Sequence, residues 1–239
     1  MRIGYQPIGD DPQNLLKQAE LAEEAGFDGL WIADDGLEPF VWSIAGALSQ
    51  RTSLPVTALV DCSTTRIHPV VLARAAATCA MLSQHFTLGL NLANRSDDRL
   101  PDQQRRDMLV EAVDVIKRLW TGERVNHHGS YYTVEDTRLS TPPKRPPPVY
   151  LLAHDIATVR LADTIADGVI VGGDESDLMT EKPSAVHVVM DGGDGVDAQI
   201  RLLDRLYENG CENVYLSVPD SGDEAFFRGF EQHVQPRYV

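Results

Sequence analysis

Two acidic side chains, Asp34 and Asp35, stand side by side directly after the apolar stretch Phe27–Ala33. That stretch is typical of a buried β-strand, so the pair is expected at the strand's carboxyl end. Neighbouring carboxyl groups repel each other's charge, which raises the pKa of one of them and lets it hold a proton for transfer. Such a pair can instead start a loop and cap the next helix. The first interpretation makes Asp34 and Asp35 the candidate catalytic residues.

A second polar segment, Asp61–His68, follows the short apolar run Leu54–Val60. Pro69 suits a first helical position, where its missing N–H costs nothing, and apolar residues then recur at helical spacing as far as Met81. Phe86–Leu92 is apolar again. Strand, polar loop, helix and strand make a βαβ unit with parallel strands. The polar loop therefore leaves a strand at its carboxyl end, where α/β folds place their chemistry.

Eight segments have the apolar character of buried strands, and helical patterns follow almost all of them. This alternation predicts a compact (β/α)8 TIM barrel in one domain, residues 1–239, with a doubly wound open sheet as the alternative. Gly172–Lys182 is too short for a full crossover helix, so we expect a shortened sixth βα unit. Thr141–Pro148 (TPPKRPPP) predicts a stiff connector between barrel halves. The expected strands are Arg2–Gln6, Phe27–Ala33, Leu54–Val60, Phe86–Leu92, Val149–Ala153, Gly168–Val171, Ala185–Met190 and Asn213–Val218.

Composition excludes several classes of function. The formal net charge of −15 argues against wrapping nucleic acid, which needs basic patches. It favours adaptation to a salty cytoplasm, with an ordinary soluble acidic protein as the alternative. No apolar run approaches the ~18 residues that a membrane span needs, and the amino terminus lacks a signal-peptide pattern. The cysteines Cys62, Cys79 and Cys211 include no CxxC pair, so we expect reduced thiols in a cytoplasmic protein.

Several longer segments follow one another in a familiar order. They are AELAEEAGFDGLWIADD (Ala19–Asp35), TTRIHPVVLARAAATCAMLSQHFTLGLN (Thr64–Asn91), RRDMLVEAVDVIKRLWTGE (Arg105–Glu123), RLADTIADGVIV (Arg160–Val171) and VDAQIRLLDRLYENGCENVYL (Val196–Leu216). Together they resemble the bacterial-luciferase-like superfamily, most of all the coenzyme F420-dependent methylenetetrahydromethanopterin reductases and their flavin-dependent relatives. The resemblance implies a barrel that binds F420 or FMN at the carboxyl ends of its strands. It also implies hydride transfer or monooxygenation on a small organic substrate.

The resemblance also implies roles for particular residues. Asp34 lies where the family keeps an acid that meets the deazaflavin ring, and Asp35 where F420-dependent members usually carry histidine. Gln6 replaces a glutamate of the reductases, and Val60-Asp61 falls on a strand bulge that often holds a non-proline cis peptide behind the ring. The residues expected to contact the coenzyme are therefore Gln6, Val60, Asp61, Asn91, Ala153, His154, Gly172 and Gly173.

Other features favour a second hypothesis, a trimmed relative without turnover that binds a flavin or another small molecule, or serves as a dimeric scaffold. The family's helix after strand 6 and its long insertion after strand 7 are largely missing. Asp155 and Asp174 stand near the expected phosphate site, where carboxylates repel an anion. Family members dimerise through the region of Phe40–Gln50 and Pro69–Ser83. Small alanines there favour a homodimer, with packing in the core of one chain as the alternative.

Three other polar motifs have simpler explanations. His68, directly before Pro69, is expected to cap a helix start, with orientation of a substrate as the alternative. Adjacent residues on a strand face opposite ways, so His127-His128 does not form a metal site, and we expect no bound metal. Gly192–Gly195 (GGDG) lacks the Lys-Ser/Thr of a phosphate loop and predicts a tight turn.

Overall fold

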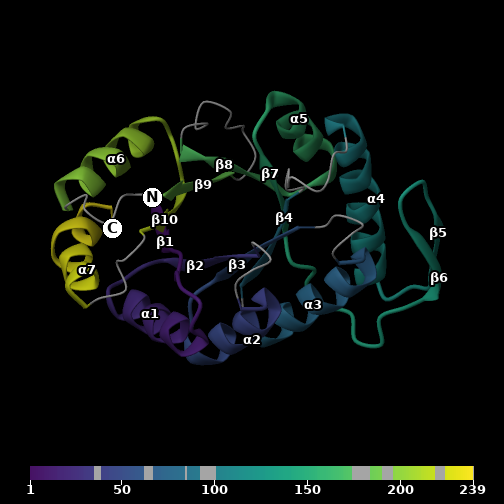
Figure 1. Cartoon of the computed structure of the whole chain (residues 1–239), viewed down its shortest axis with the longest axis horizontal. Coiled ribbons are helices and arrows are strands. Elements are labelled where there is room, and N and C mark those ends of the chain that lie inside the picture. The colour runs from purple at the N-terminus through teal and green to yellow at the C-terminus, as the bar shows by residue number, and fades with distance from the viewer. Residues whose placement is uncertain are drawn as a thin grey trace.

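The computed structural model describes residues 1–34, 39–61, 67–83, 85–91, 101–173, 184–189, 196–218 and 224–238. Within them, parallel strands close into a barrel with helices around its outside (Figure 1). The TIM-barrel prediction is therefore confirmed, and the open sheet is excluded. Around the barrel the strands are β1 (Arg2–Tyr5), β10 (Asn213–Ser217), β9 (Ser184–Val189), β8 (Gly168–Gly172), β7 (Val149–Ala153), β4 (Phe86–Asn91), β3 (Val56–Asp61) and β2 (Gly29–Ala33).

The helices begin and end where local sequence favours it. Asp11 caps the first of them by accepting the backbone N–H of Gln13 at 3.1 Å, and Pro12 occupies its first turn.

Within the described residues, no helix is both long and apolar enough to cross a membrane. Of the predicted short unit Gly172–Lys182, residues 174–182 lie outside the described residues. The helices are α1 (Pro12–Glu24), α2 (Val41–Arg51), α3 (Pro69–Leu82), α4 (Asp102–Trp120), α5 (Ile156–Ile165), α6 (Val196–Glu208) and α7 (Glu224–Gly229), then a π turn (Phe230–Val234) and a 3-10 turn (Gln235–Arg237).

Side chains of each strand alternate between the barrel interior and the layer beneath the helices. In the interior, Trp31, Leu59, Ile170 and Ala185 pack together as one buried cluster. A Cβ on Gly89 would lie 3.1 Å from the Leu59 side chain, so glycine makes room for this cluster. The cluster fills the middle of the barrel and separates a carboxyl mouth from an amino mouth.

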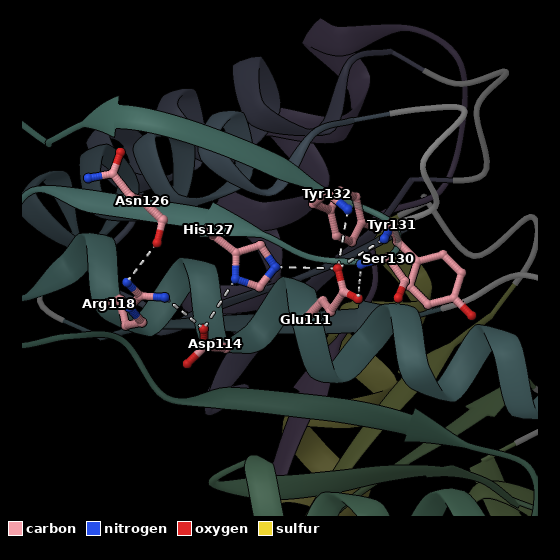
Figure 2. A network of polar contacts seen from close by, with 8 residues as sticks. All are labelled: Glu111, Asp114, Arg118, Asn126, His127, Ser130, Tyr131 and Tyr132. Atoms are coloured by element: carbon pink, nitrogen blue, oxygen red, sulfur yellow. Dashed lines mark hydrogen bonds and ion pairs between the residues drawn. The ribbon is translucent and has the colours of Figure 1, made fainter.

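A two-stranded hairpin, β5 (Val125–His128) and β6 (Thr133–Thr137), lies outside the barrel against α4. Figure 2 shows how the carboxylate of Glu111, on α4, holds the turn of this hairpin. It accepts the backbone N–H groups of Ser130 at 2.8 Å, Tyr131 at 3.1 Å and Tyr132 at 3.2 Å. His127 Nε2 lies 3.3 Å from the same carboxylate, so this histidine belongs to an anchor of the hairpin.

Candidate active site at the carboxyl mouth

Strand alternation aims two predicted residues into the carboxyl mouth. On β3, Leu59 belongs to the interior cluster, and the hydroxyl of Thr57 lies 3.1 Å from that of Tyr215 inside the barrel. Asp61, two residues beyond Leu59, therefore faces the interior as well, and it is 3% exposed. Register pairs Asp61 with Asn91 at the end of β4. The fold thus brings a buried carboxylate and a carboxamide together at the carboxyl mouth.

His187 is a residue of this mouth that the sequence analysis missed. Its Nε2 lies 2.7 Å from Oε1 of Gln6, and the carboxamide oxygen can only accept, so the imidazole N–H donates. The imidazole also stacks on the indole of Trp31, with ring centroids 5.2 Å apart and planes inclined by 10°. Burial lowers the pKa of His187 from 6.5 to about 4. The imidazole is therefore neutral at pH 7 and fixed between Gln6 and Trp31.

Trp31 forms the floor of the mouth and carries an unsatisfied donor. Its side chain is fully buried, and its indole Nε1–H has no hydrogen-bond partner among the described residues. A buried donor without an acceptor costs about 1–3 kcal/mol, so native proteins usually satisfy it with water, an ion or a ligand. Ala33, the next inward residue of β2, is small and packs against the cluster that contains the indole.

Comparison with known proteins decides the family. The profile described as "Luciferase-like monooxygenase" matches residues 2–189. The chain belongs to this family. Among the curated relatives, the F420-dependent glucose-6-phosphate dehydrogenase of Microbacterium testaceum is 34% identical over 201 residues, covering 76% of this chain and 60% of the relative. The F420-dependent hydroxymycolic acid dehydrogenase of Mycobacterium tuberculosis is 30% identical over 170 residues, covering 64% and 47%. The chain thus spans less than two thirds of the length of these two relatives.

Solved structures share the fold at low identity. An F420-dependent secondary alcohol dehydrogenase in complex with an F420-acetone adduct superposes with a TM-score of 0.84 at 18% identity, covering 100% of this chain and 99% of that one. The coenzyme F420-dependent tetrahydromethanopterin reductase from Methanopyrus kandleri gives a TM-score of 0.81 at 15% identity, with the same coverage. At these identities the likeness concerns the barrel itself.

This luciferase-like barrel departs from the expected phosphate site at the end of β7. Asp155 caps α5, and its Oδ1 accepts the N–H of Thr158 at 2.6 Å. That hydrogen bond is the main cause lowering the pKa of Asp155, and the charge of Arg106 contributes. The amino end of α5 therefore already holds a carboxylate. Ala153 packs its side chain into the core, whereas His154 is exposed beside the cap.

The other residues predicted to contact the coenzyme differ in burial and in which of their atoms could reach a ligand. Val60 is fully buried in the core, so only its backbone can reach a ligand. The prediction of a strand bulge with a cis peptide at Val60-Asp61 is wrong. β3 pairs with β4 in unbroken register, and the described residues contain no cis peptide bond. Gly172 ends β8 half-buried, and a Cβ on Gly173 would lie 3.1 Å from Val188. The luciferase-like mouth thus keeps small residues on this side.

The predicted acidic pair is described only in part. Asp34 is half-buried directly after β2, where its backbone N–H donates to the carbonyl of Leu59 at 2.9 Å. Asp35 and the GGDG turn lie outside the described residues, so their roles stay predictions. The helix-capping role expected of His68 is confirmed, because its Nδ1 accepts the N–H of Val70 at 3.3 Å.

Proposed function

We propose that this chain is an oxidoreductase that uses F420, or FMN as the alternative, and acts on a small organic substrate. The observation that carries the proposal is the convergence of Gln6, Asp61, Asn91 and His187 above the apolar floor of the carboxyl mouth. The curated relatives named above are F420-dependent dehydrogenases, which favours hydride transfer over monooxygenation.

The residues of the mouth fit the ring of such a coenzyme. Flavin and deazaflavin rings carry oxygen and nitrogen atoms on their edges, which suit carboxamide and imidazole partners. The unsatisfied N–H of Trp31 is the kind of donor that a ring oxygen would accept from. The amino end of α5 does not fit a phosphate, because Asp155 occupies its donors. The coenzyme's phosphate must therefore bind away from α5.

The chain's own residues would position the reactants and handle a proton. When bound, the coenzyme supplies the two-electron chemistry. Gln6 and His187 hold each other in place, which limits motion of the groups facing the ring. Neutral His187 donates through Nε2, so its Nδ1 lone pair remains able to accept a hydrogen bond. Asp34, with Asp35 as the alternative, would hold the proton that the substrate gains or loses.

A coenzyme titration tests this function. We expect F420 or FMN to quench tryptophan fluorescence saturably, because Trp31 forms the floor of the proposed site. Asp61→Asn should weaken the binding about tenfold, whereas Gln103→Ala, on the exposed side of α4, should leave it unchanged. Asp34→Asn should abolish turnover while the free energy of unfolding changes little. Absence of binding by both coenzymes would refute the proposal.

That negative result would favour the second candidate, a trimmed relative without turnover. One observation supports it: the carboxylate cap at the amino end of α5. A protein of this kind would bind neither coenzyme through its phosphate. Riboflavin, which carries the ring without phosphate, is the ligand that separates loss of the phosphate site from loss of the ring site.

We also propose a homodimer through α2 and α3. Large apolar side chains are exposed there: Phe40, directly before α2, is 57% exposed, and Val71 on α3 is 46% exposed. Such side chains favour a protein–protein contact when they gather on neighbouring helices. Val71→Lys should shift the protein from dimer to monomer in sedimentation velocity. A wild-type protein that sediments as a monomer at micromolar concentration would contradict this part.

We propose that the chain is adapted to high salt, since its net charge of −15 implies self-repulsion that salt screens. The urea midpoint of unfolding should therefore rise between about 0.1 M and about 2 M KCl. A midpoint that stays constant or falls would contradict this proposal.

A further inference from the structure

The amino mouth of the barrel, opposite the proposed coenzyme site, opens into a cavity of about 1360 Å³. Three parts of the chain line it: the inward side chains at the start of the barrel strands, the end of α3, and the proline-rich connector Thr141–Pro148. All of these residues are described. The amino end of a TIM barrel usually serves stability, so a large lined cavity here needs its own explanation.

The floor of this cavity is built around Tyr215. A Cβ on Gly4 of β1 would overlap the Tyr215 ring, and a Cβ on Gly29 of β2 would lie 3.7 Å from it. Two neighbouring strands therefore lack side chains where the ring lies across the barrel. The Tyr215 hydroxyl is held by Thr57 at 3.1 Å. This arrangement gives the cavity a flat aromatic base with a fixed polar edge.

Tyr150 adds a free hydroxyl to the same floor. Its side chain is half-buried, and its hydroxyl has no hydrogen-bond partner among the described residues. Burial raises the pKa of Tyr150, although the nearby charge of Arg2 acts in the opposite direction. The phenol is therefore protonated at neutral pH and available as a donor to a ligand.

The charge of the lining differs in sign from that of the whole chain. Arg2, Lys144 and Arg145 line the cavity, and none of them forms an ion pair with the described residues. The carboxylate in the lining, Asp28, already accepts the backbone N–H of Ile3 at 2.8 Å. In a protein of net charge −15, three cations that have no ion-pair partner in the described part of the chain make a local site for an anion around this cavity.

We propose that the amino mouth binds an anionic small molecule with a flat apolar body, such as an aromatic carboxylate or sulfonate. Its body would lie between the floor tyrosines and the proline wall of the connector, and its acid group would face Lys144 and Arg145. The buried cluster around Trp31 and Ile170 separates this ligand from the carboxyl mouth. The proposal stands independently of the proposed coenzyme.

Dye binding to the full chain tests the proposal. The probe is anilinonaphthalene sulfonate, which becomes fluorescent when bound, and the neutral comparison is N-phenylnaphthylamine, which has the same body without the sulfonate. We expect one sulfonate per chain. The double variant Lys144→Glu/Arg145→Glu should weaken sulfonate binding about tenfold or more and leave the neutral dye within about twofold.

Two further variants show whether the sulfonate binds in the amino mouth. Arg160→Glu/Arg201→Glu makes the same change in net charge on exposed positions of α5 and α6, and should leave sulfonate binding within about twofold of wild type. Tyr150→Phe should weaken it by removing the free hydroxyl. Circular dichroism and urea unfolding confirm that each variant folds.

Four results would overturn the proposal: equal losses in both double variants, no saturation, competition between the sulfonate and F420, or exclusion of the dye by a second copy of the chain at high protein concentration. Competition would place the coenzyme itself in the amino mouth, and exclusion would make this face a subunit interface. Failure of F420 to bind anywhere would leave the expected dye result unchanged.

Discussion

Removal of the Glu111 carboxylate should loosen the hairpin from α4. In the folded chain this group accepts three backbone N–H groups of the turn at 2.8–3.2 Å and lies 3.3 Å from His127 Nε2. A Cβ on Gly129 would overlap the carboxylate, so the turn backbone lies directly against it. The hairpin has few other polar attachments to α4, among them Arg118 donating to the carbonyl of Asn126 at 3.1 Å (Figure 2).

The cost of the change can be estimated from these contacts. A hydrogen bond to a charged acceptor contributes about 1.5–3 kcal/mol, and neighbouring bonds to one group are not additive. The side chain of Glu111 is 17% exposed, so water satisfies some of the freed donors. We therefore expect Glu111→Ala to lower the free energy of unfolding by about 3 kcal/mol, and Glu111→Gln by about 1–2 kcal/mol because one oxygen remains.

The same contacts make the free energy of unfolding depend on pH. Burial acts to raise the pKa of Glu111, but hydrogen bonds from Tyr131, Ser130, His127 and Tyr132 outweigh it and hold the pKa below 4.5. The unfolded chain therefore binds a proton at higher pH than the folded chain. The stabilisation is present above about pH 4.5 and is lost as pH falls through the lower folded-state pKa. In Glu111→Ala this part of the acid destabilisation should disappear.

Urea unfolding followed by far-UV circular dichroism measures both effects. The matched control is Glu20→Gln, which removes an ion pair with Arg51 at 3.0 Å on a side chain that is 40% exposed. Surface pairs contribute about 0–1 kcal/mol, so this change should be small. If Glu111→Ala lowers the free energy of unfolding no more than Glu20→Gln does, the Glu111 carboxylate does not stabilise the hairpin.

Two other predictions concern the barrel interior. Because the pKa of His187 falls from 6.5 to about 4 on folding, the free energy of unfolding should decline by up to about 3 kcal/mol as pH falls from 6.5 towards 4. His187→Gln should flatten this decline in urea titrations, and an NMR titration of His187 near pH 6.5 would contradict it. Gly4→Ala should destabilise the fold by about 1–3 kcal/mol through overlap with Tyr215. Gly46→Ala, in the interior of α2, should stabilise it by about 0.5–1 kcal/mol, because the added Cβ would lie 4.0 Å from the Leu82 side chain and overlap nothing. Equal melting temperatures for the two alanine variants would refute this contrast.

The strands could be predicted because buried parallel strands are short apolar runs between polar loops. Leu54–Val60 and Phe86–Leu92 match β3 and β4 to within two residues at each end. Once the barrel is known, alternation places Asp61 and Asn91 inside it, since both lie two residues beyond an interior position. This part of the candidate site follows from local pattern.

His187 could not be found in the same way. Its strand is buried on both faces, so the sequence SAVHVV shows little alternation and only two polar residues, Ser184 and His187. Its partner Gln6 lies 181 residues away, across the closure of the barrel. The available signal was a histidine inside an apolar strand, two residues beyond Ala185. Only the closed barrel shows that the His187 side chain contacts Gln6, directly after β1.

The amino mouth was also missed, for a different reason. Thr141–Pro148 indicates a stiff connector, but sequence does not show what a connector covers. Lys144 and Arg145 of the connector become part of a candidate site only because Tyr150 and Tyr215, from two barrel strands, line the same cavity. The histidine and the cavity were therefore missed because both depend on contacts between distant parts of the chain. The strands and helices could be predicted because they depend on local apolar pattern.

The two mouths share Trp31, and this limits how they can be tested. One side of the Trp31 indole stacks on His187 at 5.2 Å, and the ring of Tyr215 lies 5.2 Å from the same indole. A substitution of Trp31 would therefore disturb both the proposed coenzyme site and the floor of the amino mouth. Asp61, at the carboxyl end, and Lys144, on the connector, are far apart in the barrel and each touches one mouth. Variants at these two positions can thus assign a lost ligand to one end of the barrel, whereas a variant at the central tryptophan cannot.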